Sequence, residues 1–273
     1  ATRKGMQAIW FMLLLLVAIA LGNSDIDSLL EFKKSIQNDP SGLVVNSWDS
    51  RSLDSDGCPK NWHGIVCSEG SVISITLDNA GLVGEFNFLA ISGLTMLRNL
   101  SAVNNHFTGD LLYIATIESL EYADLSLNKF NGPLLSNFTQ LRKLIYLNLS
   151  SNELGGTLPI EFHKLEQLKI SGTPDLGLAD ESFLSSIQYL NISHNSLSGE
   201  LFAHDGMPYL DNLEVFDASN NQLEGNLPSF TFVVSLRILR LACNQLTGLL
   251  PEALLKESSM MLSELDLSQN KLE

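Results

Sequence analysis

The stretch LIYLNLSSNELGGTLP, residues 144–159, carries five leucines in sixteen positions, and the asparagines Asn148 and Asn152 stand between its apolar residues. A helix or strand that packs one face on a core gains nothing from an asparagine at such a position, because a buried amide needs hydrogen-bond partners. The asparagine side chain carries both a donor and an acceptor. The stretch therefore indicates a chain that turns back inside its own hydrophobic core and satisfies the backbone groups of the turn with an amide.

The same phrase returns along the chain in the form L-x-L-x-x-N-x-L-x-G, with Ile, Phe or Ala in place of some leucines. The glycines that close the first four copies are 25, 23 and 24 residues apart, which is typical of leucine-rich repeats of roughly 20 to 29 residues. The copies are LSAVNNHFTG (100–109), ADLSLNKFNG (123–132), LNLSSNELGG (147–156), LNISHNSLSG (190–199), FDASNNQLEG (216–225) and LRLACNQLTG (239–248), with a degenerate copy at 75–84 and an incomplete one at 265–273.

Leucine-rich repeats stack because a single repeat is too small to bury its own apolar face, so the leucines of successive repeats merge into one core. The L-x-L run alternates as a strand does, which predicts one parallel sheet along the concave side of an α/β solenoid. In the first copy Ala80 replaces the asparagine, as expected of an atypical terminal repeat. The predicted structural ladder of amides consists of Asn105, Asn128, Asn152, Asn195, Asn221, Asn244 and Asn270.

The N-terminal segment predicts export. Arg3 and Lys4 precede an uncharged run of fifteen apolar or small residues, 8–22, and Ala20 and Gly22 fit positions −3 and −1 of a signal-peptide cleavage site. The alternative is an uncleaved anchor, although a bilayer span needs roughly 20 apolar residues. The domain prediction is a signal peptide at 1–22, a cap at 23–70 and about eight to nine repeats at 71–273, the last one incomplete.

Composition excludes some partners. Of the 273 residues 45% are hydrophobic, which is enough for a large core, and the net charge of −15 disfavours nucleic acid and anionic lipid. No second apolar segment of membrane length follows the leader, so membrane attachment is expected only through a segment outside this chain.

A cap is expected before the repeats. SDIDSLLEFKKSIQNDP (24–40) predicts a helix that Ser24 or Asp25 caps, that buries Ile26, Leu29, Leu30 and Ile36, and that stops by Pro40. Trp48 and Trp62 are bulky enough to cover the open end of the core. Cys58 and Cys67 are close in sequence and predict a disulfide; the alternatives are reduced buried thiols or metal ligands, for which only His63 is near.

These residues resemble a known family. LLEFKKSI, SW and CPKNWHGIVC, followed by repeats that end in GxLP at 156–159, 225–228 and 248–251, are similar to the ectodomains of plant leucine-rich-repeat receptor-like kinases, and to a branch with long ectodomains and often inactive kinase domains. The resemblance implies a right-handed, twisted solenoid that binds a peptide or a co-receptor outside the cell and signals through a transmembrane helix and a kinase-like domain that this chain lacks.

One repeat departs from the pattern. The glycine spacing falls to 16 between Gly156 and Gly172 and rises to 27 before Gly199, and the L-x-L-x-x-N centre is absent from 165–187. A truncated repeat explains this spacing. The sequence then predicts a sheet that is interrupted or distorted between Leu168 and Ile187.

Solvent-facing strand positions are the expected recognition surface of a solenoid. The candidate ligand-binding residues are Tyr122, Asp124, Tyr146, Tyr189, Asp217 and Arg240. Tyrosines supply contact area at low entropic cost, but aromatic residues also suit strands without any ligand. Four N-x-S/T sequons are candidate glycosylation sites: Asn99, Asn137, Asn148 and Asn191.

The predicted function is extracellular recognition, as the ligand- or co-receptor-binding part of a receptor-like kinase; the alternative is a soluble secreted repeat protein such as an inhibitor. No catalytic motif, cofactor motif or metal-ligand spacing occurs among the five histidines and three cysteines, so we expect no enzyme activity, cofactor or metal. Cys243 is expected to be a partly buried bystander, with redox or intermolecular pairing as the alternative.

Overall fold

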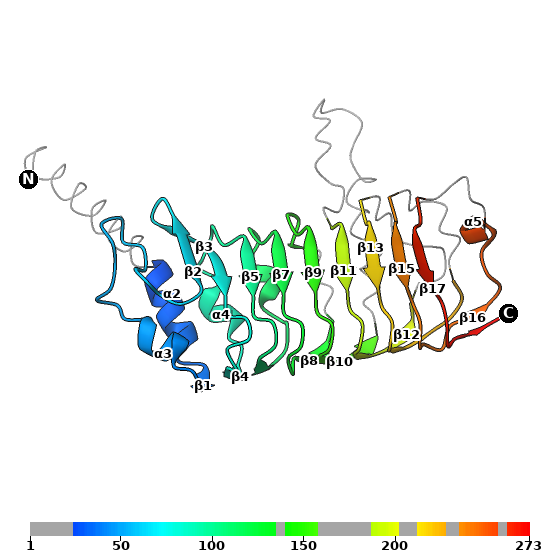
Figure 1. The fold of residues 1–273 in the computed structure, drawn as a ribbon, viewed down its shortest axis with the longest axis horizontal. Helices are drawn as coiled ribbons and strands as arrows, with labels where there is room; N and C mark the ends of the chain where they lie inside the picture. Colours follow the sequence, from blue (N-terminus) through cyan, green and yellow to red (C-terminus); the bar gives the residue numbers. More distant parts are fainter. Residues whose placement is uncertain (1–23, 135–139, 158–186, 202–211, 228–234, 256–260) are drawn as a thin grey trace, which may run out of the picture.

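The computed structural model describes residues 24–134, 140–157, 187–201, 212–227, 235–255 and 261–273. The predicted signal peptide, the sequon at Asn137 and nearly all of the predicted truncated repeat at 165–187 lie outside these residues. The described chain is a rod of stacked repeats along which strands lie side by side, with helices α2 (Ser24–Lys33) and α3 (Leu43–Ser47) at its N-terminal end (Figure 1).

Each repeat places its L-x-L run in one nine-stranded sheet. All neighbouring strands are parallel except β2 and β3, which form an antiparallel pair at the cap. In chain order the strands are β2 (Ile65–Ser68), β3 (Ser71–Thr76), β5 (Asn99–Ser101), β7 (Tyr122–Asp124), β9 (Tyr146–Asn148), β11 (Tyr189–Asn191), β13 (Val215–Asp217), β15 (Ile238–Arg240) and β17 (Glu264–Asp266). The solvent side of these strands is called the sheet face below.

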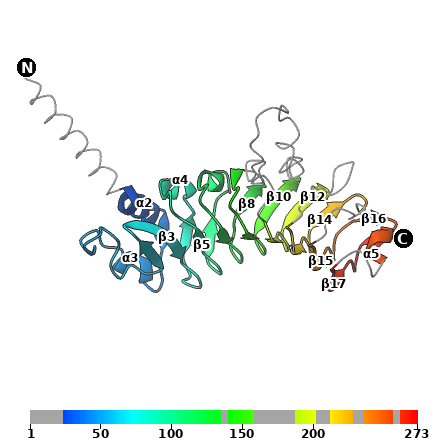
Figure 2. The ribbon, with the colours of Figure 1, turned by 90° about the horizontal axis from the view of Figure 1, so that it is seen from above.

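Short strands and helical turns close the repeats behind this sheet. Figure 2 shows α4 (Phe88–Ile91), β10 (Glu153–Thr157) and β12 (Ser196–Glu200) along one side of the rod, and β5, β15 and β17 along the other. The remaining elements are β1 (Ile36–Asn38), β4 (Val83–Glu85), β6 (His106–Thr108), η1 (Ile114–Thr116), β8 (Asn131–Pro133), β14 (Gln222–Glu224), β16 (Thr247–Gly248), α5 (Glu252–Leu255) and β18 (Lys271–Leu272). The strands behind the main sheet form three smaller sheets. Their orders are β14-β12-β10-β8, β1-β4-β6 and β16-β18.

One cluster of buried hydrophobic residues runs through the whole rod, from Ile26 in the cap to Leu246 near the other end. The leucines that occupy the same place in successive repeats, such as Leu100, Leu147 and Leu239, are almost completely buried. This arrangement is the merging of small apolar faces that the repeat pattern predicts, and it confirms the solenoid fold.

The cap closes one end of the core with aromatic rings. The indole rings of Trp48 and Trp62 stack with centroids 5.5 Å apart, and each ring N–H donates to a backbone carbonyl, of His63 and Asp49 respectively. Polar ring atoms are thus satisfied while the ring bodies exclude water from the core.

The helix of the cap differs from its prediction at one end. It ends at Lys33, and Ile36 lies in β1 instead, where it pairs antiparallel with Gly84 of β4. The chain approaches so closely there that a Cβ at Gly84 would stand 2.1 Å from the Ser35 carbonyl oxygen. Phe32, which is not among the residues predicted to be buried by the helix, is completely buried and contacts the ring of Phe86 at a centroid distance of 4.7 Å.

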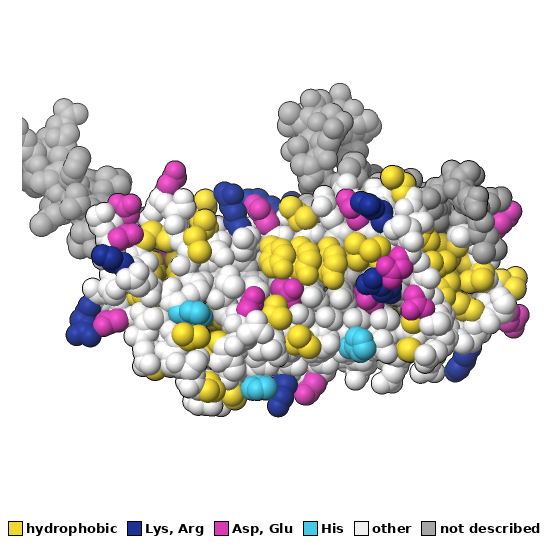
Figure 3. Space-filling model, viewed as in Figure 1, with side chains coloured by type: hydrophobic (Ala, Val, Ile, Leu, Met, Phe, Trp, Pro, Cys, Tyr) yellow, Lys and Arg dark blue, Asp and Glu magenta, His cyan; other side chains and the backbone are white. Residues whose placement is uncertain are grey.

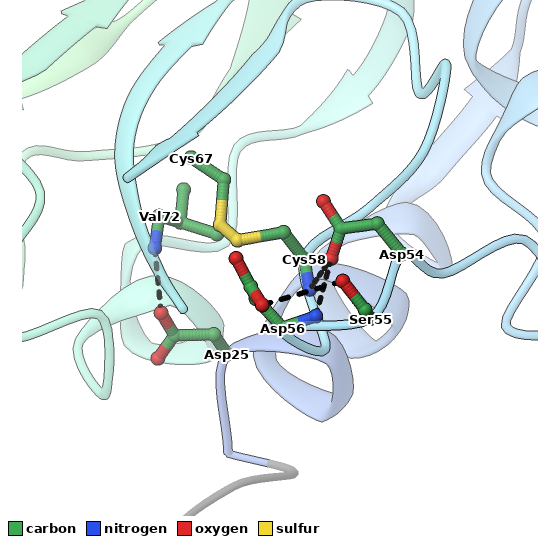
Figure 4. Close-up of a disulfide and its surroundings, with 7 residues drawn as sticks. All are labelled: Asp25, Asp54, Ser55, Asp56, Cys58, Cys67 and Val72. Carbon is green, nitrogen blue, oxygen red and sulfur yellow. Dashed lines mark hydrogen bonds between the residues drawn. A yellow bond between two sulfur atoms is a disulfide. The ribbon is translucent and has the colours of Figure 1, made fainter. Parts of the chain in front are cut away.

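A disulfide joins Cys58 to Cys67 across a separation of nine residues (Figure 4). The carboxylate of Asp54 accepts hydrogen bonds from the backbone N–H groups of Asp56 and Cys58 and shapes the loop. Asp25, expected as a helix cap, accepts a hydrogen bond of 2.8 Å from the backbone N–H of Val72, so it ties α2 to the start of β3.

The nine-stranded sheet is continuous across the irregular part of the sequence. β11 pairs directly with β9, so that Tyr189 lies opposite Tyr146, and β12 likewise pairs with β10. The sheet is thus continuous from β9 to β11, and the predicted interruption or distortion between Leu168 and Ile187 falls on residues outside the described ranges.

Candidate functional site

The asparagine of each repeat makes the same hydrogen bonds inside the turn. In Asn128 the side-chain oxygen accepts from the backbone N–H of Phe107 at 3.0 Å, and the amide nitrogen donates to the carbonyls of Ala102 at 2.7 Å, Ser126 at 3.0 Å and Leu125 at 3.2 Å. Each amide thus joins its own repeat to the preceding one. The same pattern recurs at Asn105, Asn152, Asn195, Asn221, Asn244 and Asn270.

The residue before each of these asparagines adopts the left-handed backbone conformation. It is an asparagine in some repeats, but Leu127 has a φ of +56° and Cys243 a φ of +57°. This conformation aims the following amide into the core, and it is costly for residues other than glycine or asparagine. The Cys243 thiol, which the sequence could not pair, is half-buried and donates to the Oε1 atom of Gln269 at 3.3 Å.

The sheet face carries a stack of tyrosines. Tyr122, Tyr146 and Tyr189 occupy the same position in three adjacent strands, and neighbouring rings lie 4.3 Å apart and within 12° of parallel. Val215 and Ile238 continue the same column on β13 and β15. In Figure 3 a continuous hydrophobic row crosses the middle of this face. We call these five half-buried side chains the tyrosine strip.

Sequence reasoning found the tyrosines but missed Val215 and Ile238, which belong to the strip only through their place in the register. The signal was available, because both residues directly precede the inward-facing residue of their strand, as the tyrosines do. Aliphatic residues suit any strand, so their residue type alone does not indicate a recognition surface.

The sequence predicts that Asp124 and Asp217 face solvent, but both side chains are buried in the structure. Each is 7% exposed. Asp124 accepts hydrogen bonds from the hydroxyl of Tyr146 at 3.2 Å, from the side-chain amide of Asn148 at 3.1 Å and from both the hydroxyl and the backbone N–H of Ser126. Its carboxylate is therefore part of the support of the tyrosine strip, because the side chains of the next strand cover it.

Arg240 is paired on both sides. Its guanidinium donates two hydrogen bonds to the carboxylate of Glu264, at 2.5 and 2.8 Å, and stands 3.7 Å from the carboxylate of Asp217. The bond from Arg240 lowers the pKa of Glu264 below its ordinary value. Charged side chains lie at the C-terminal end of the hydrophobic row in Figure 3.

Buried and charged surroundings shift the phenols of the strip. Burial, followed by the negative charge of Asp124, raises the pKa of the Tyr146 phenol above its ordinary value, and the same two causes raise the pKa of Tyr122. Both hydroxyl groups stay protonated at neutral pH, and the Tyr146 hydroxyl uses its proton in the hydrogen bond to Asp124.

The three described sequons have different surroundings. Asn99 on β5 is exposed, whereas Asn148 and Asn191 are half-buried and their side-chain oxygens accept from the backbone N–H groups of Ser150 and Ser193. Within the described ranges, no three His, Cys, Asp or Glu side chains gather closely enough to hold a metal ion. In those same ranges no helix is both long and apolar enough to cross a bilayer.

Two family profiles match this chain, one over the N-terminal cap and one over the repeats. A family profile described as "Leucine rich repeat N-terminal domain" matches residues 22–68. The profile "Leucine Rich Repeat" matches residues 143–165, 186–204, 212–232 and 235–256.

Two relatives come from Arabidopsis thaliana. A probable inactive receptor kinase is 39% identical over 296 residues, which covers 95% of this chain and 28% of the relative. The LRR receptor-like serine/threonine-protein kinase GHR1 is 50% identical over 91 residues, 33% of this chain and 9% of the relative. The chain thus spans less than a third of the length of either relative.

A similar fold occurs in the crystal structure of the leucine-rich-repeat ectodomain of the plant membrane receptor kinase GASSHO1/SCHENGEN3 from Arabidopsis thaliana, solved in complex with CASPARIAN STRIP INTEGRITY FACTOR 2. The TM-score is 0.67 at 24% sequence identity, over 90% of this chain and 30% of that one.

Proposed function

Since the chain belongs to the leucine-rich-repeat ectodomains of plant receptor-like kinases, we propose that it recognises an extended peptide, alone or together with a co-receptor ectodomain, on the outer side of the plasma membrane. In this proposal the chain itself carries out recognition only. The membrane-spanning helix and the kinase-like domain that pass on the signal belong to a longer protein, of which this chain is one part.

The observation that carries the proposal is the tyrosine strip. It places apolar side chains in register across five adjacent strands, from Tyr122 on β7 to Ile238 on β15. Partly buried aromatic side chains lose little rotamer freedom on binding and dominate the energetics of many interfaces. A peptide that runs along the rod across the strands would contact all five members in turn.

Charge favours a basic partner. The strip is bordered by Glu121 and Glu214, which pair only at 3.8 Å with Arg98 and Arg237, and the cation Arg240 is already bound to Glu264. With a chain net charge of −15, association with a basic peptide should be fast at low ionic strength and slow down as salt is added.

The test uses the secreted chain and a displayed library of random twelve-residue peptides as the probe. Peptides that bind are measured by fluorescence anisotropy against the unchanged chain, Tyr189→Ala and Tyr113→Ala. Tyr113 is a matched control because it is 44% exposed and lies beside α4, away from the strip. We expect Tyr189→Ala to weaken binding about tenfold or more and Tyr113→Ala to leave it unchanged.

Selected peptides that bind both variants equally would contradict the role of the strip. The sequence encoded after Glu273 tests the other half of the proposal. A hydrophobic span of roughly 20 residues followed by a kinase-like domain supports a receptor, whereas a final capping repeat and a stop codon would support the soluble secreted protein instead.

A further inference from the structure

We propose that Asn99 carries an N-linked glycan whose first sugar packs on the outer ring face of Tyr122. The inference rests on one part of the proposed function, secretion, and is independent of any peptide ligand. It assigns a modification site, and it places a sugar against the end of the tyrosine strip that is nearest to β5.

Asn99 has the sequence and the surroundings that an attached glycan needs. It begins the sequon N-L-S on β5, its side chain is exposed, and it makes no side-chain hydrogen bond to any other described residue. Modification of its amide nitrogen would therefore break nothing in the folded rod. The neighbouring strand places Tyr122 directly opposite Asn99, and paired parallel strands lie about 4.8 Å apart.

Tyr122 stands at one end of the three-ring stack, so one face of its ring is not covered by another tyrosine. The ring of Tyr146 has a neighbour on each side, Tyr122 and Tyr189, both at 4.3 Å. Among the described residues Tyr122 stacks only on Tyr146, so its second face points along the column towards β5 and Asn99. A face of N-acetylglucosamine consists of C–H groups, which are apolar and slightly positive, and the face of an aromatic ring is apolar and negative. Contact between them removes apolar surface from water.

The two sequons further along the sheet face offer no such site. The amide nitrogen of Asn148 donates to the buried carboxylate of Asp124, and that of Asn191 lies 3.4 Å from the hydroxyl of Tyr189. A glycan would replace one of the two hydrogens on each nitrogen, so the sugar would compete with these partners for the space around the amide. The ring of Tyr146, on the strand of Asn148, is covered by other rings on both faces, and the ring of Tyr189, on the strand of Asn191, has Tyr146 on one side and Val215 next in the column on the other. Folded molecules are therefore expected to be modified at Asn99 and unmodified at Asn148 and Asn191.

A glycan at this position limits where a partner can lie. It covers the β5 end of the column up to the outer ring face of Tyr122, and it leaves the strip itself open towards Val215 and Ile238. A peptide on the strip would therefore extend from β7 towards β15 and not towards β5.

The first experiment maps the glycans. The chain is expressed in plant leaf cells with its own residues 1–22, and the secreted protein is digested, deglycosylated in heavy-oxygen water and analysed by mass spectrometry. We expect the label at Asn99 and none at Asn148 or Asn191. Label at other sequons without Asn99 would overturn this inference alone. Absence of label from all four sequons, Asn137 included, would contradict secretion itself.

The second experiment tests the contact with the ring. Hydroxyl-radical footprinting compares the glycosylated chain with Asn99→Gln, and the glycan is also trimmed to a single N-acetylglucosamine. We expect Tyr122 to be oxidised severalfold more slowly in the glycosylated and in the trimmed protein, with Tyr113 unchanged as the internal control. Equal oxidation of Tyr122 in all three proteins would show that the sugar does not cover the ring.

A thermal readout completes the test without depending on labelling. The Tm difference between the glycosylated chain and Asn99→Gln, expected at about 2 °C for a contact near 1 kcal/mol, should disappear when Tyr122→Ala is present in both. Persistence of the full difference in the Tyr122→Ala background would overturn the contact. If Tyr122→Ala does not fold, the footprinting result decides.

Discussion

The inner asparagine column and the outer column of the sheet face repeat with the same period, yet only the inner column keeps one residue type. Each inner amide bonds to the same backbone atoms of two repeats, as Asn128 does with Phe107 and Ala102. The outer column holds Asp124, Asn148, Asn191, Asp217, Arg240 and Asp266. All but Arg240 accept a hydrogen bond from the backbone N–H of the serine two residues on, but their other contacts vary: Asp124 also accepts from the next strand, and Arg240 binds Glu264. A position with identical contacts in every repeat accepts one side chain, whereas a position with varied contacts is free to serve recognition.

The largest effect should come from the inner column. Asn128→Ala removes four hydrogen bonds and leaves the buried N–H of Phe107 and three carbonyls without that partner. We expect the free energy of unfolding to fall by about 3 to 4 kcal/mol, measured by urea denaturation. Asn131→Ala is the control, because Asn131 is exposed on β8, and a surface change of this kind should cost less than about 0.5 kcal/mol. Equal losses in the two variants would remove the distinction between the columns.

The outer column is itself divided by burial, and Asp124 tests this division. Asp124→Ala leaves the donors of Tyr146, Asn148 and Ser126 without their shared acceptor, so we expect a loss of about 2 kcal/mol. Asp266 bonds to Ser268 in the same way but stands at the exposed end of the sheet. Its replacement by alanine should cost only about 0.5 kcal/mol. If both variants lose the same amount, the cover from the next strand contributes nothing.

This contrast explains how far the sequence could be read. The asparagine ladder is predictable because its cause lies within one repeat: a turn inside a core needs an amide, and the period fixes where. The burial of Asp124 is not predictable in that way, because it depends on Tyr146 and Asn148 in the following repeat. Ile36 was misplaced for a similar reason: its partner Gly84 comes from a distant segment.

The irregular repeat shows the same limit. Glycine spacing reveals that something differs between Gly156 and Gly199, but spacing cannot tell whether the strands on either side still meet. The structure joins β9 to β11 in register, because stacking requires only that each strand find a neighbour with a matching apolar side. Extra chain between two strands leaves that requirement intact.

The turn column next to the ladder offers a gain in stability. Leu127 holds a left-handed φ of +56° while its side chain is 50% exposed, so it bears a backbone cost with little burial in return. Leu127→Asn should raise the free energy of unfolding by about 0.5 to 1 kcal/mol, because asparagine adopts this conformation more easily. Leu112→Asn is the control, since Leu112 is similarly exposed but has no left-handed backbone. A gain in both variants would point to surface polarity as the cause.

The smallest effect concerns the charged end of the outer column. The bond from Arg240 lowers the pKa of Glu264 from its ordinary 4.5, so the pair stabilises the fold above that pH and loses its contribution as pH falls through the lowered pKa. In Arg240→Gln the pKa of Glu264 should rise, as measured by carboxyl-carbon NMR, and the stability difference from the unchanged chain should shrink under acid. Arg237→Gln should leave the pKa of Glu264 in place, because Arg237 faces Glu214. A rise in both variants would mean that the general field of the sheet face, and not the bidentate contact, sets this pKa.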